Sequence, residues 1–256
     1  MRSLVVVFAL LAFATLAADA KPRRSRDATL KKTKRAVKLK HRLDHHFNRL
    51  AIHGPIHGQS YGAPWAGELH DPAQLPEGDG YVIRRPWRSF GTRSTVDYVM
   101  RAITDIREQF PDTHVLAIGD ISAKDGGQIT EHHSHQSGRD VDVGLIYKQQ
   151  PDGFPKSFVR ATEDNLDCEA TYALLSDLAD TAKSDGGAQV IFLDYNVQGM
   201  LYRWAKDHGE DPDILEHTFQ YPHRGASGAL VRHEPNHDNH MHVRFKCPHG
   251  DTACTN

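Results

Sequence analysis

The chain has 256 residues, with 31 Lys and Arg, 33 Asp and Glu and three cysteines. Residues 1–50 hold 13 of the basic and three of the acidic residues, which leaves 18 basic against 30 acidic residues over 51–256. An acidic body with a basic N-terminal segment does not favour nucleic acid as a partner, and three cysteines cannot form a disulfide framework.

The N-terminus has the pattern of a secretory signal peptide. Arg2 precedes an apolar run from Leu4 to Leu16, which is too short to span a bilayer as a helix. Ala18-Asp19-Ala20 fits the A-x-A cleavage pattern, so we expect cleavage after Ala20 and export to the periplasm or the extracellular space. The alternative interpretation of this run is a membrane anchor. No later segment is long and apolar enough to predict a transmembrane helix.

The remaining chain divides into a basic linker over residues 21–50 and one domain over 51–256, which is long enough for a sizeable core. The linker is expected to be a solvated segment or an amphipathic helix, and electrostatic attachment to anionic wall or lipid is the alternative. Residues 51–93 are rich in Gly, Pro and aromatics, which predicts irregular structure with short strands such as 81–83.

The domain then alternates helical and strand patterns. Helices are predicted over 94–110, with Ser94 as the N-cap, over 165–183 and over 197–209. Buried strands are predicted over 115–118, 141–147, 190–193 and 241–245, and polar loops over 119–138 and 210–236. This order predicts a single α+β domain with a small, mainly antiparallel sheet flanked by helices and long loops.

Histidine is abundant, with 18 residues, and seven of them form two clusters near aspartates. Imidazole and carboxylate are ligands that suit zinc, so the clusters predict a metal site. The first cluster comprises His132, His133 and His135, and the second comprises His233, His237, His240 and His242.

Strand alternation narrows the choice of ligands. His240, His242 and Arg244 share one strand face, and the apolar residues between them share the other. The two histidines are about 6.6 Å apart along the strand, whereas Zn–N bonds are about 2.0–2.1 Å. A natural arrangement is therefore that one of these two histidines binds the metal and the other lies within reach of a water molecule bound to the metal. Asp140 and Asp142 share a strand face in the same way.

His135 reaches this region from the preceding turn, where Gly138 allows the chain to bend. A competing motif lies in the second cluster, because His233-Glu234-Pro235-Asn236-His237 matches H-E-x-x-H. That motif requires a helix through both histidines, and a proline inside a helix costs about 3 kcal/mol or more. The helical protease motif is therefore rejected.

Two segments resemble those of penicillin-insensitive murein endopeptidases. They are Ser134–Asp142, which reads S-H-Q-S-G-R-D-V-D, and His237–Arg244, which reads H-D-N-H-M-H-V-R. Weaker likeness extends through 58–62, 84–91 and 119–121, and residues 148–236 match poorly. The wider group includes lysostaphin-type peptidases, D-alanyl-D-alanine carboxypeptidases and the hedgehog signalling domain, which share a metal site on a small antiparallel sheet.

The resemblance implies a role for each matching residue. One Zn²⁺ ion per chain would be bound by His135, Asp142 and His242, beside the catalytic His240 and His237. Asp140, His132 and Arg244 would support the ligands or contact substrate, and Cys247 and Cys254 would form a disulfide that leaves Cys168 free.

The implied activity is hydrolysis of D-alanyl–diaminopimelate cross-links in peptidoglycan by a zinc endopeptidase that penicillin does not inhibit. A D,D-carboxypeptidase of the same fold, a non-catalytic metal-dependent binding module and a structural zinc protein are the alternatives. The carboxypeptidases resemble E-x-x-H at the last ligand, whereas this chain has Asn239 three residues before His242. That difference favours the endopeptidases.

Overall fold

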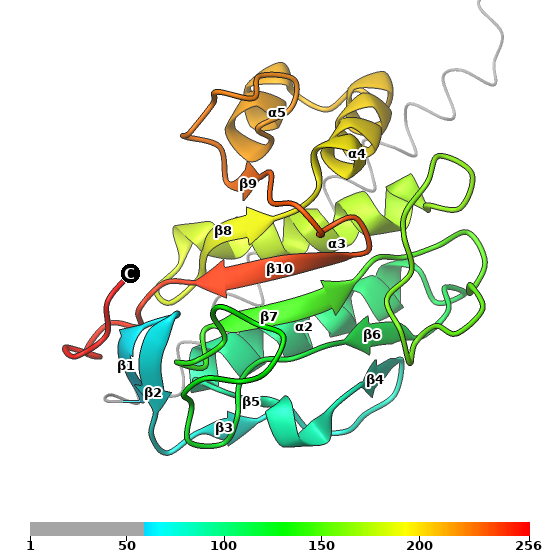
Figure 1. The fold of residues 1–256 in the computed structure, drawn as a ribbon. Helices are drawn as coiled ribbons and strands as arrows, with labels where there is room; N and C mark the ends of the chain where they lie inside the picture. Colours follow the sequence, from blue (N-terminus) through cyan, green and yellow to red (C-terminus); the bar gives the residue numbers. More distant parts are fainter. Residues whose placement is uncertain (1–58) are drawn as a thin grey trace, which may run out of the picture. The chain divides into compact units, whose positions relative to one another are not determined.

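In the computed structural model, residues 59–256 are described, and a six-stranded sheet with the order β4-β6-β7-β10-β8-β9 runs through them (Figure 1). The four central strands pair antiparallel, and the two edge strands pair parallel with their neighbours. The predicted α+β class with a mainly antiparallel sheet is confirmed. The strands are β4 (Tyr81–Ile83), β6 (Leu116–Ile118), β7 (Asp140–Gly144), β8 (Ala188–Phe192), β9 (Val231–Arg232) and β10 (His240–Phe245).

Two small sheets precede the main one. β1 (Ser60–Ala63) and β2 (Ala66–Leu69) form a hairpin, and β3 (Ala73–Gln74) pairs with β5 (Phe90–Gly91). A short 3-10 helix, η1 (Pro86–Arg88), lies between β4 and β5. These elements agree with the short strands predicted within 51–93. The predicted signal peptide (1–20) and basic linker (21–50) lie outside the described residues.

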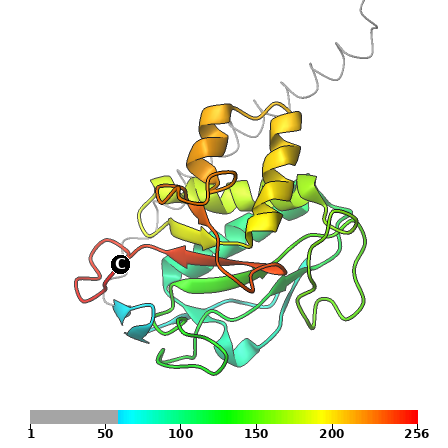
Figure 2. The same ribbon diagram turned by 45° about the horizontal axis from the view of Figure 1, so that its top comes forward.

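The helices cover one face and one edge of the sheet. α2 (Arg93–Gln109) and α3 (Cys168–Asp180) lie behind the sheet in Figure 1, and η2 (Thr181–Lys183) follows α3 directly. α4 (Tyr195–Asp207) and α5 (Pro212–Thr218) lie side by side at the edge formed by β8 and β9 (Figure 2). Of the helices described, none has the length and apolarity that a membrane span requires.

Two predictions about these elements need correction. The N-cap of α2 is Thr92, not Ser94, because the Thr92 side chain accepts a hydrogen bond from the backbone N–H of Thr95. The segment 210–236 is not only a loop, since it contains α5 and β9. A seven-residue helix with one buried residue, Leu215, is too short to show a helical period, and β9 is a two-residue strand that is defined by its pairing with β8.

The two central strands, β7 and β10, are apolar on the face toward the helices and polar on the other. The β7–β10 register places His242 opposite Asp142 and Arg244 opposite Asp140. The alternate residues of both strands are at most 2% exposed and belong to the core; they are Val141, Val143, Met241, Val243 and Phe245. Because successive side chains alternate between faces, core packing determines which face presents the polar groups.

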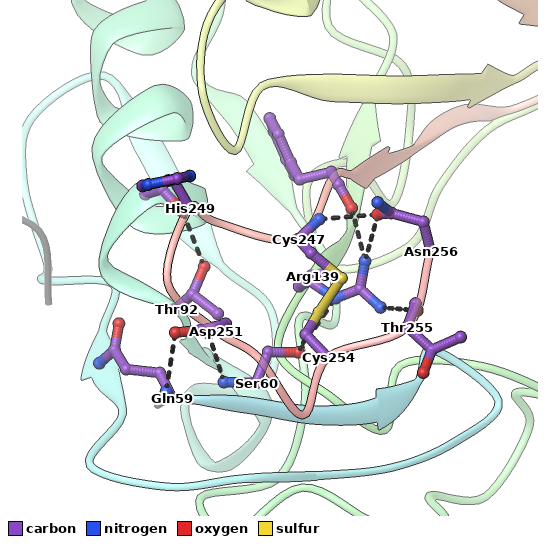
Figure 3. Close-up of a disulfide and its surroundings, with 12 residues drawn as sticks. Gln59, Ser60, Thr92, Arg139, Cys247, His249, Asp251, Cys254, Thr255 and Asn256 are labelled. Carbon is purple, nitrogen blue, oxygen red and sulfur yellow. Dashed lines mark hydrogen bonds between the residues drawn. A yellow bond between two sulfur atoms is a disulfide. The ribbon is translucent and has the colours of Figure 1, made fainter. Parts of the chain in front are cut away.

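The C-terminal segment is tied to the first hairpin (Figure 3). Cys247 and Cys254 form a disulfide and Cys168 is free, as predicted. The buried carboxylate of Asp251 accepts hydrogen bonds from the backbone N–H groups of Gln59 and Ser60. These contacts join the last ten residues of the chain to the start of β1.

Arg139 connects this junction to β7. Its guanidinium is fully buried and donates to Ser60 Oγ at 3.0 Å, to the carbonyl oxygen of Phe245 at 3.1 Å and to that of Thr255 at 2.6 Å (Figure 3). The residue that precedes Asp140 is therefore held by the hairpin, by β10 and by the C-terminal segment. A buried guanidinium with several acceptors rigidifies its surroundings, because leaving a donor unsatisfied is costly.

A buried carboxyl group between α2 and α3 predicts a pH-dependent stability. Burial, together with the nearby carboxylates of Asp105 and Asp180, raises the pKa of Asp177 from 3.8 to about 8 against the opposing effect of Arg101. The folded state therefore binds more protons than the unfolded state between these two values, so this group destabilises the fold as pH rises through that window. Asp177→Asn removes the titration, and its stability relative to wild type should increase from about pH 4 to about pH 8.

Urea unfolding of both proteins across this pH range measures the difference. Asp207→Asn, which changes an exposed aspartate at the end of α4, is the control and should show a much smaller change with pH. A difference between Asp177→Asn and wild type that stays constant with pH would contradict the prediction.

Candidate metal centre

The central pair of strands brings an aspartate and a histidine face to face, and a turn adds a second histidine. Asp142 on β7 lies opposite His242 on β10. His135 adopts a positive φ of 66°, a conformation that costs a non-glycine residue about 1–3 kcal/mol. Its backbone N–H donates to Asp140 Oδ2 at 2.9 Å, which holds the strained turn against β7. Gly138 has a φ of 69° and makes the expected bend.

Three ligand-type atoms of these residues form a nearly equilateral triangle. His135 Nε2 is 3.3 Å from His242 Nδ1, and both nitrogens are 3.4 Å from Asp142 Oδ1. Tetrahedral ligands with bonds of about 2.0–2.1 Å to zinc are about 3.3–3.4 Å apart. Asp142 Oδ1 is buried and has no hydrogen-bond partner. A small cation at the centre would satisfy that oxygen.

The outer nitrogen of each ring faces an oxygen acceptor: His135 Nδ1 is hydrogen-bonded, and His242 Nε2 lies within ion-pair distance of a carboxylate without a well-aligned hydrogen bond. His135 Nδ1 lies 2.9 Å from the carbonyl oxygen of Ile121. A carbonyl only accepts, so Nδ1 carries the hydrogen and the neutral ring has its lone pair on Nε2. His242 Nε2 lies 3.2 Å from Asp140 Oδ1, which favours a lone pair on Nδ1. Such partners orient ligand histidines in metal sites.

A second set of residues overlaps the first. His132, His135 and Asp142 also have ligand atoms close enough together to hold a metal ion. However, His132 Nε2 lies 3.0 Å from Asp120 Oδ2 and 3.8 Å from Asp142 Oδ2. The ionised Asp120 accepts the hydrogen of that nitrogen, so the nitrogen nearest the centre lacks a free lone pair. His135 and Asp142 belong to both sets, and the tighter triangle includes His242.

The charge of the cluster also fits a cation. Burial raises the pKa values of Asp140 and Asp142, but the neighbouring histidines outweigh it and hold both pKa values well below the ordinary value. Burial lowers the pKa of His135, but Asp142 and Asp140 together raise it to about 9. Two ionised carboxylates in a buried site require positive charge near them, from protons or from a metal.

His240 and His237, the predicted catalytic residues, both lie beside the triangle. His240 Nε2 is 3.6 Å from Asp142 Oδ1, and the ring centroids of His240 and His237 are 4.8 Å apart. Burial lowers the pKa of His240 to about 4, with Asp142 opposing and His237 reinforcing this shift. The ring is therefore neutral at neutral pH and can accept a proton.

Phe158 is a site residue that the sequence did not reveal. Its ring stacks on His240 with centroids 4.7 Å apart and planes 12° apart, and the Arg84 guanidinium carbon is 4.2 Å from its centroid. A side chain on Gly119 would lie 2.9 Å from the Phe158 ring and 2.8 Å from Asp142 Cβ, so glycine is required there. Phe158 comes from a loop with no recognisable motif, and the tertiary structure alone brings it to the site.

Asp120 is the second residue that was missed. Its fully buried carboxylate contacts Arg85 Nε at 2.8 Å, Arg88 Nη1 at 2.9 Å and His132 Nε2 at 3.0 Å. Burial raises its pKa, but His132 and the two arginines lower it below the ordinary value. The available signal was a polar residue directly after the buried strand β6. Asp140, which was predicted, is the matching group on the other side and binds Arg244 Nε at 2.8 Å.

A profile of the penicillin-insensitive murein endopeptidases matches residues 60–190, which is more than half of the chain. The chain belongs to this family. The match includes His132, His135 and Asp142 and ends before the second histidine cluster. The β7–β10 pairing therefore supplies the link between the two segments.

Individual relatives carry the same family name. The penicillin-insensitive murein endopeptidase of Klebsiella pneumoniae (strain 342) is 27% identical over 216 residues, which cover 79% of this chain and 72% of that protein. That of Pectobacterium atrosepticum is 27% identical over 194 residues, or 72% of this chain and 62% of that protein. The penicillin-insensitive murein endopeptidase of Haemophilus influenzae is 26% identical over 203 residues, which cover 71% of this chain and 60% of that protein.

Asp140 offers a test of how the buried carboxylate supports the centre. Asp140→Asn keeps the size of the side chain but weakens its contacts with His242 and Arg244, so zinc affinity should fall by about 10–100-fold. Competition with a chromogenic chelator measures the affinity. Asp211→Asn, at the exposed N-cap of α5, is the matched control and should bind zinc as wild type does. Equal affinities for all three proteins would rule out this supporting role.

Proposed function

We propose that this protein is a zinc-dependent endopeptidase that hydrolyses D-alanyl–diaminopimelate cross-links of peptidoglycan. The observation that carries the proposal is the 3.3–3.4 Å triangle around the unpartnered oxygen of Asp142. The names of its relatives support murein as the substrate. The signal pattern in residues 1–20 supports export to the periplasm.

His135, Asp142 and His242 are the proposed ligands of one zinc ion. Three protein ligands leave a fourth position open, which is the arrangement of catalytic rather than structural zinc. Zinc bound there supplies a Lewis acid that polarises the scissile carbonyl and makes water more acidic. One carboxylate among the ligands leaves the site with a net positive charge.

His240 is the proposed proton-transfer group. Its neutral ring lies beside the centre and accepts a proton as water adds to the carbonyl carbon of the cross-link. The new bond is C–O and the bond that breaks is C–N, and the same proton then passes to the departing amine. His237 Nδ1 lies 3.0 Å from the carbonyl oxygen of Pro235, which leaves its Nε2 able to share this role.

The surrounding groups orient this chemistry. Phe158 holds the plane of the His240 ring through stacking, and Asp140 orients His242. Arg244 and His132 lie beside the ligands and are positioned to contact a substrate carboxylate or the polarised carbonyl. No acyl-enzyme forms in this scheme, because water and not a side chain is the nucleophile.

Digestion of purified peptidoglycan, followed by mass spectrometry of the products, tests the proposal. Cross-linked dimers should become monomers, metal-stripped protein should be inactive, and added zinc should restore the activity. Release of terminal D-alanine from monomeric pentapeptide without cleavage of dimers would identify a D,D-carboxypeptidase instead. Metal binding without turnover of either substrate would identify a binding module.

Two histidine variants separate ligand from catalyst. His242→Ala should remove a ligand, reduce zinc content and lower stability. His240→Ala should keep its zinc and lower kcat by about 10²–10⁴-fold, the usual contribution of a positioned proton-transfer group. Metal analysis and kinetics on both proteins measure these effects. Equal loss of zinc from both variants would mean four protein ligands and would overturn the open-position mechanism.

Penicillin should leave the activity unchanged. The proposed mechanism uses no nucleophilic serine, so the drug has no group to acylate. Cleavage of cross-linked dimer is measured with and without penicillin at a concentration that saturates a serine D,D-peptidase, which serves as the control. Loss of activity together with a covalent penicilloyl adduct would contradict the mechanism.

A further inference from the structure

Two tryptophans stand out among the large apolar side chains that the described part of the chain exposes. Trp87 is 66% exposed and Trp65 is 54% exposed. Neither belongs to the core, so packing does not explain their presence. Tryptophan supplies a large, rigid contact area and is enriched among the residues that dominate binding energy.

Trp65 is held at the edge of the candidate metal centre. It lies in the turn of the β1–β2 hairpin, and its ring centroid is 5.5 Å from the guanidinium carbon of Arg244. Arg244 binds Asp140, which contacts His242. The backbone N–H of Gln136 donates to the carbonyl oxygen of Pro64 at 3.0 Å, which ties the turn to the loop that carries His135. Figure 1 shows the hairpin at the end of the sheet where β7 begins and β10 ends.

Trp87 lies in another element, η1, whose arginines contact the same centre. It is the middle residue of η1, which the hydrogen bond from Arg88 N–H to the carbonyl oxygen of Arg85 closes at 2.8 Å. Both arginines contact the buried carboxylate of Asp120, which contacts His132. Trp65 thus contacts an arginine of the centre, and Trp87 directly precedes such an arginine in the chain.

The groups around the two indoles indicate the chemistry of a ligand. Arg244 lies beside Trp65, and Arg88 flanks Trp87. A flat apolar surface with planar hydrogen-bonding groups at its edge matches a pyranose ring, which has an apolar C–H face and polar hydroxyls around it. Murein consists of glycan strands joined by peptides, so a cross-link in the centre brings sugar rings close to its rim.

We propose that Trp65 and Trp87 form a binding surface for the sugar rings of murein glycan strands on either side of the peptide cross-link. This inference rests on the proposed function, since it assigns the polymer that the same site would act on. The proposed surface is an additional subsite that binds the glycan rather than the peptide. Polymeric substrate would therefore bind more tightly than the isolated cross-link.

The test compares two substrates on the full-length, zinc-loaded protein. One is intact sacculi, and the other is the soluble cross-linked peptide dimer without sugars. Trp65→Ala or Trp87→Ala should lower the ratio of kcat/KM on sacculi to kcat/KM on the dimer by about tenfold. A loss of this size is typical when a residue that dominates binding is truncated. Trp→Tyr at either position should restore most of the ratio, because an aromatic face remains.

Ile214→Ala, which changes an exposed apolar residue of α5, is the control and should leave the ratio unchanged. Equal losses on both substrates would overturn the glycan assignment and place the tryptophans in the peptide site or in folding. Competition by peptide-free glycan strands for sedimentation with sacculi provides a readout without catalysis. If glycan strands displace the wild-type protein from sacculi but do not displace either alanine variant, the binding surface is supported even if the proposed cleavage fails. If glycan strands do not displace the wild-type protein, the proposed surface is overturned.

Discussion

The structure depends on the burial of two ionised carboxylates on one face of β7. Asp140 is fully buried and Asp142 nearly so, and the pKa of each lies well below the ordinary value. Burial of an unpaired carboxylate is prohibitively costly, so each must be matched by nearby positive charge. Arg244 compensates Asp140, whereas Asp142 meets only histidine nitrogens at 3.4 Å or more. This imbalance makes Asp142 the carboxylate whose charge must be matched by a protonated His135 or by a bound cation.

The remainder of the domain holds that arrangement in place. The apolar faces of β7 and β10 pack toward α2 and α3, and this packing directs Asp142 and His242 to the same side. The start of β7 is held in place by the hydrogen bonds of Arg139 to β1 and to the C-terminal segment that contains the disulfide. Preorganisation of this kind is what a metal site requires, because ligands must be held close to their productive geometry before the ion binds.

Two parallel chains of contacts extend from the centre to the surface. One runs from His242 through Asp140 to Arg244, and the other from His132 through Asp120 to Arg88. Each chain of contacts orients a histidine of the candidate metal centre. The first ends at an arginine that contacts Trp65, and the second ends at an arginine that follows Trp87 in the sequence. The same buried aspartates therefore support the chemistry of the centre and position the surface proposed to bind glycan.

The sequence alone determined the parts of the site that follow from local periodicity. Alternation in 240–245 and 140–143 assigned the polar faces, and His135 with Gly138 marked the turn. The family resemblance supplied the pairing of the two segments and the disulfide. The strand and helix positions were also predicted, within a few residues at their ends, because each amphipathic pattern extends over several positions.

Only the tertiary structure decided the contacts that join distant segments. Asp120 and Phe158 enter the site through chain folding, and α5 and β9 are too short to leave a periodic signal. The sequence predicted Ser94 as the N-cap, whereas the structure has Thr92, because several neighbouring hydroxyl residues could each cap the helix. The 3.3–3.4 Å triangle joins His242 to Asp142 and His135, which lie 100 and 107 positions earlier in the chain, and no local pattern encodes such distances.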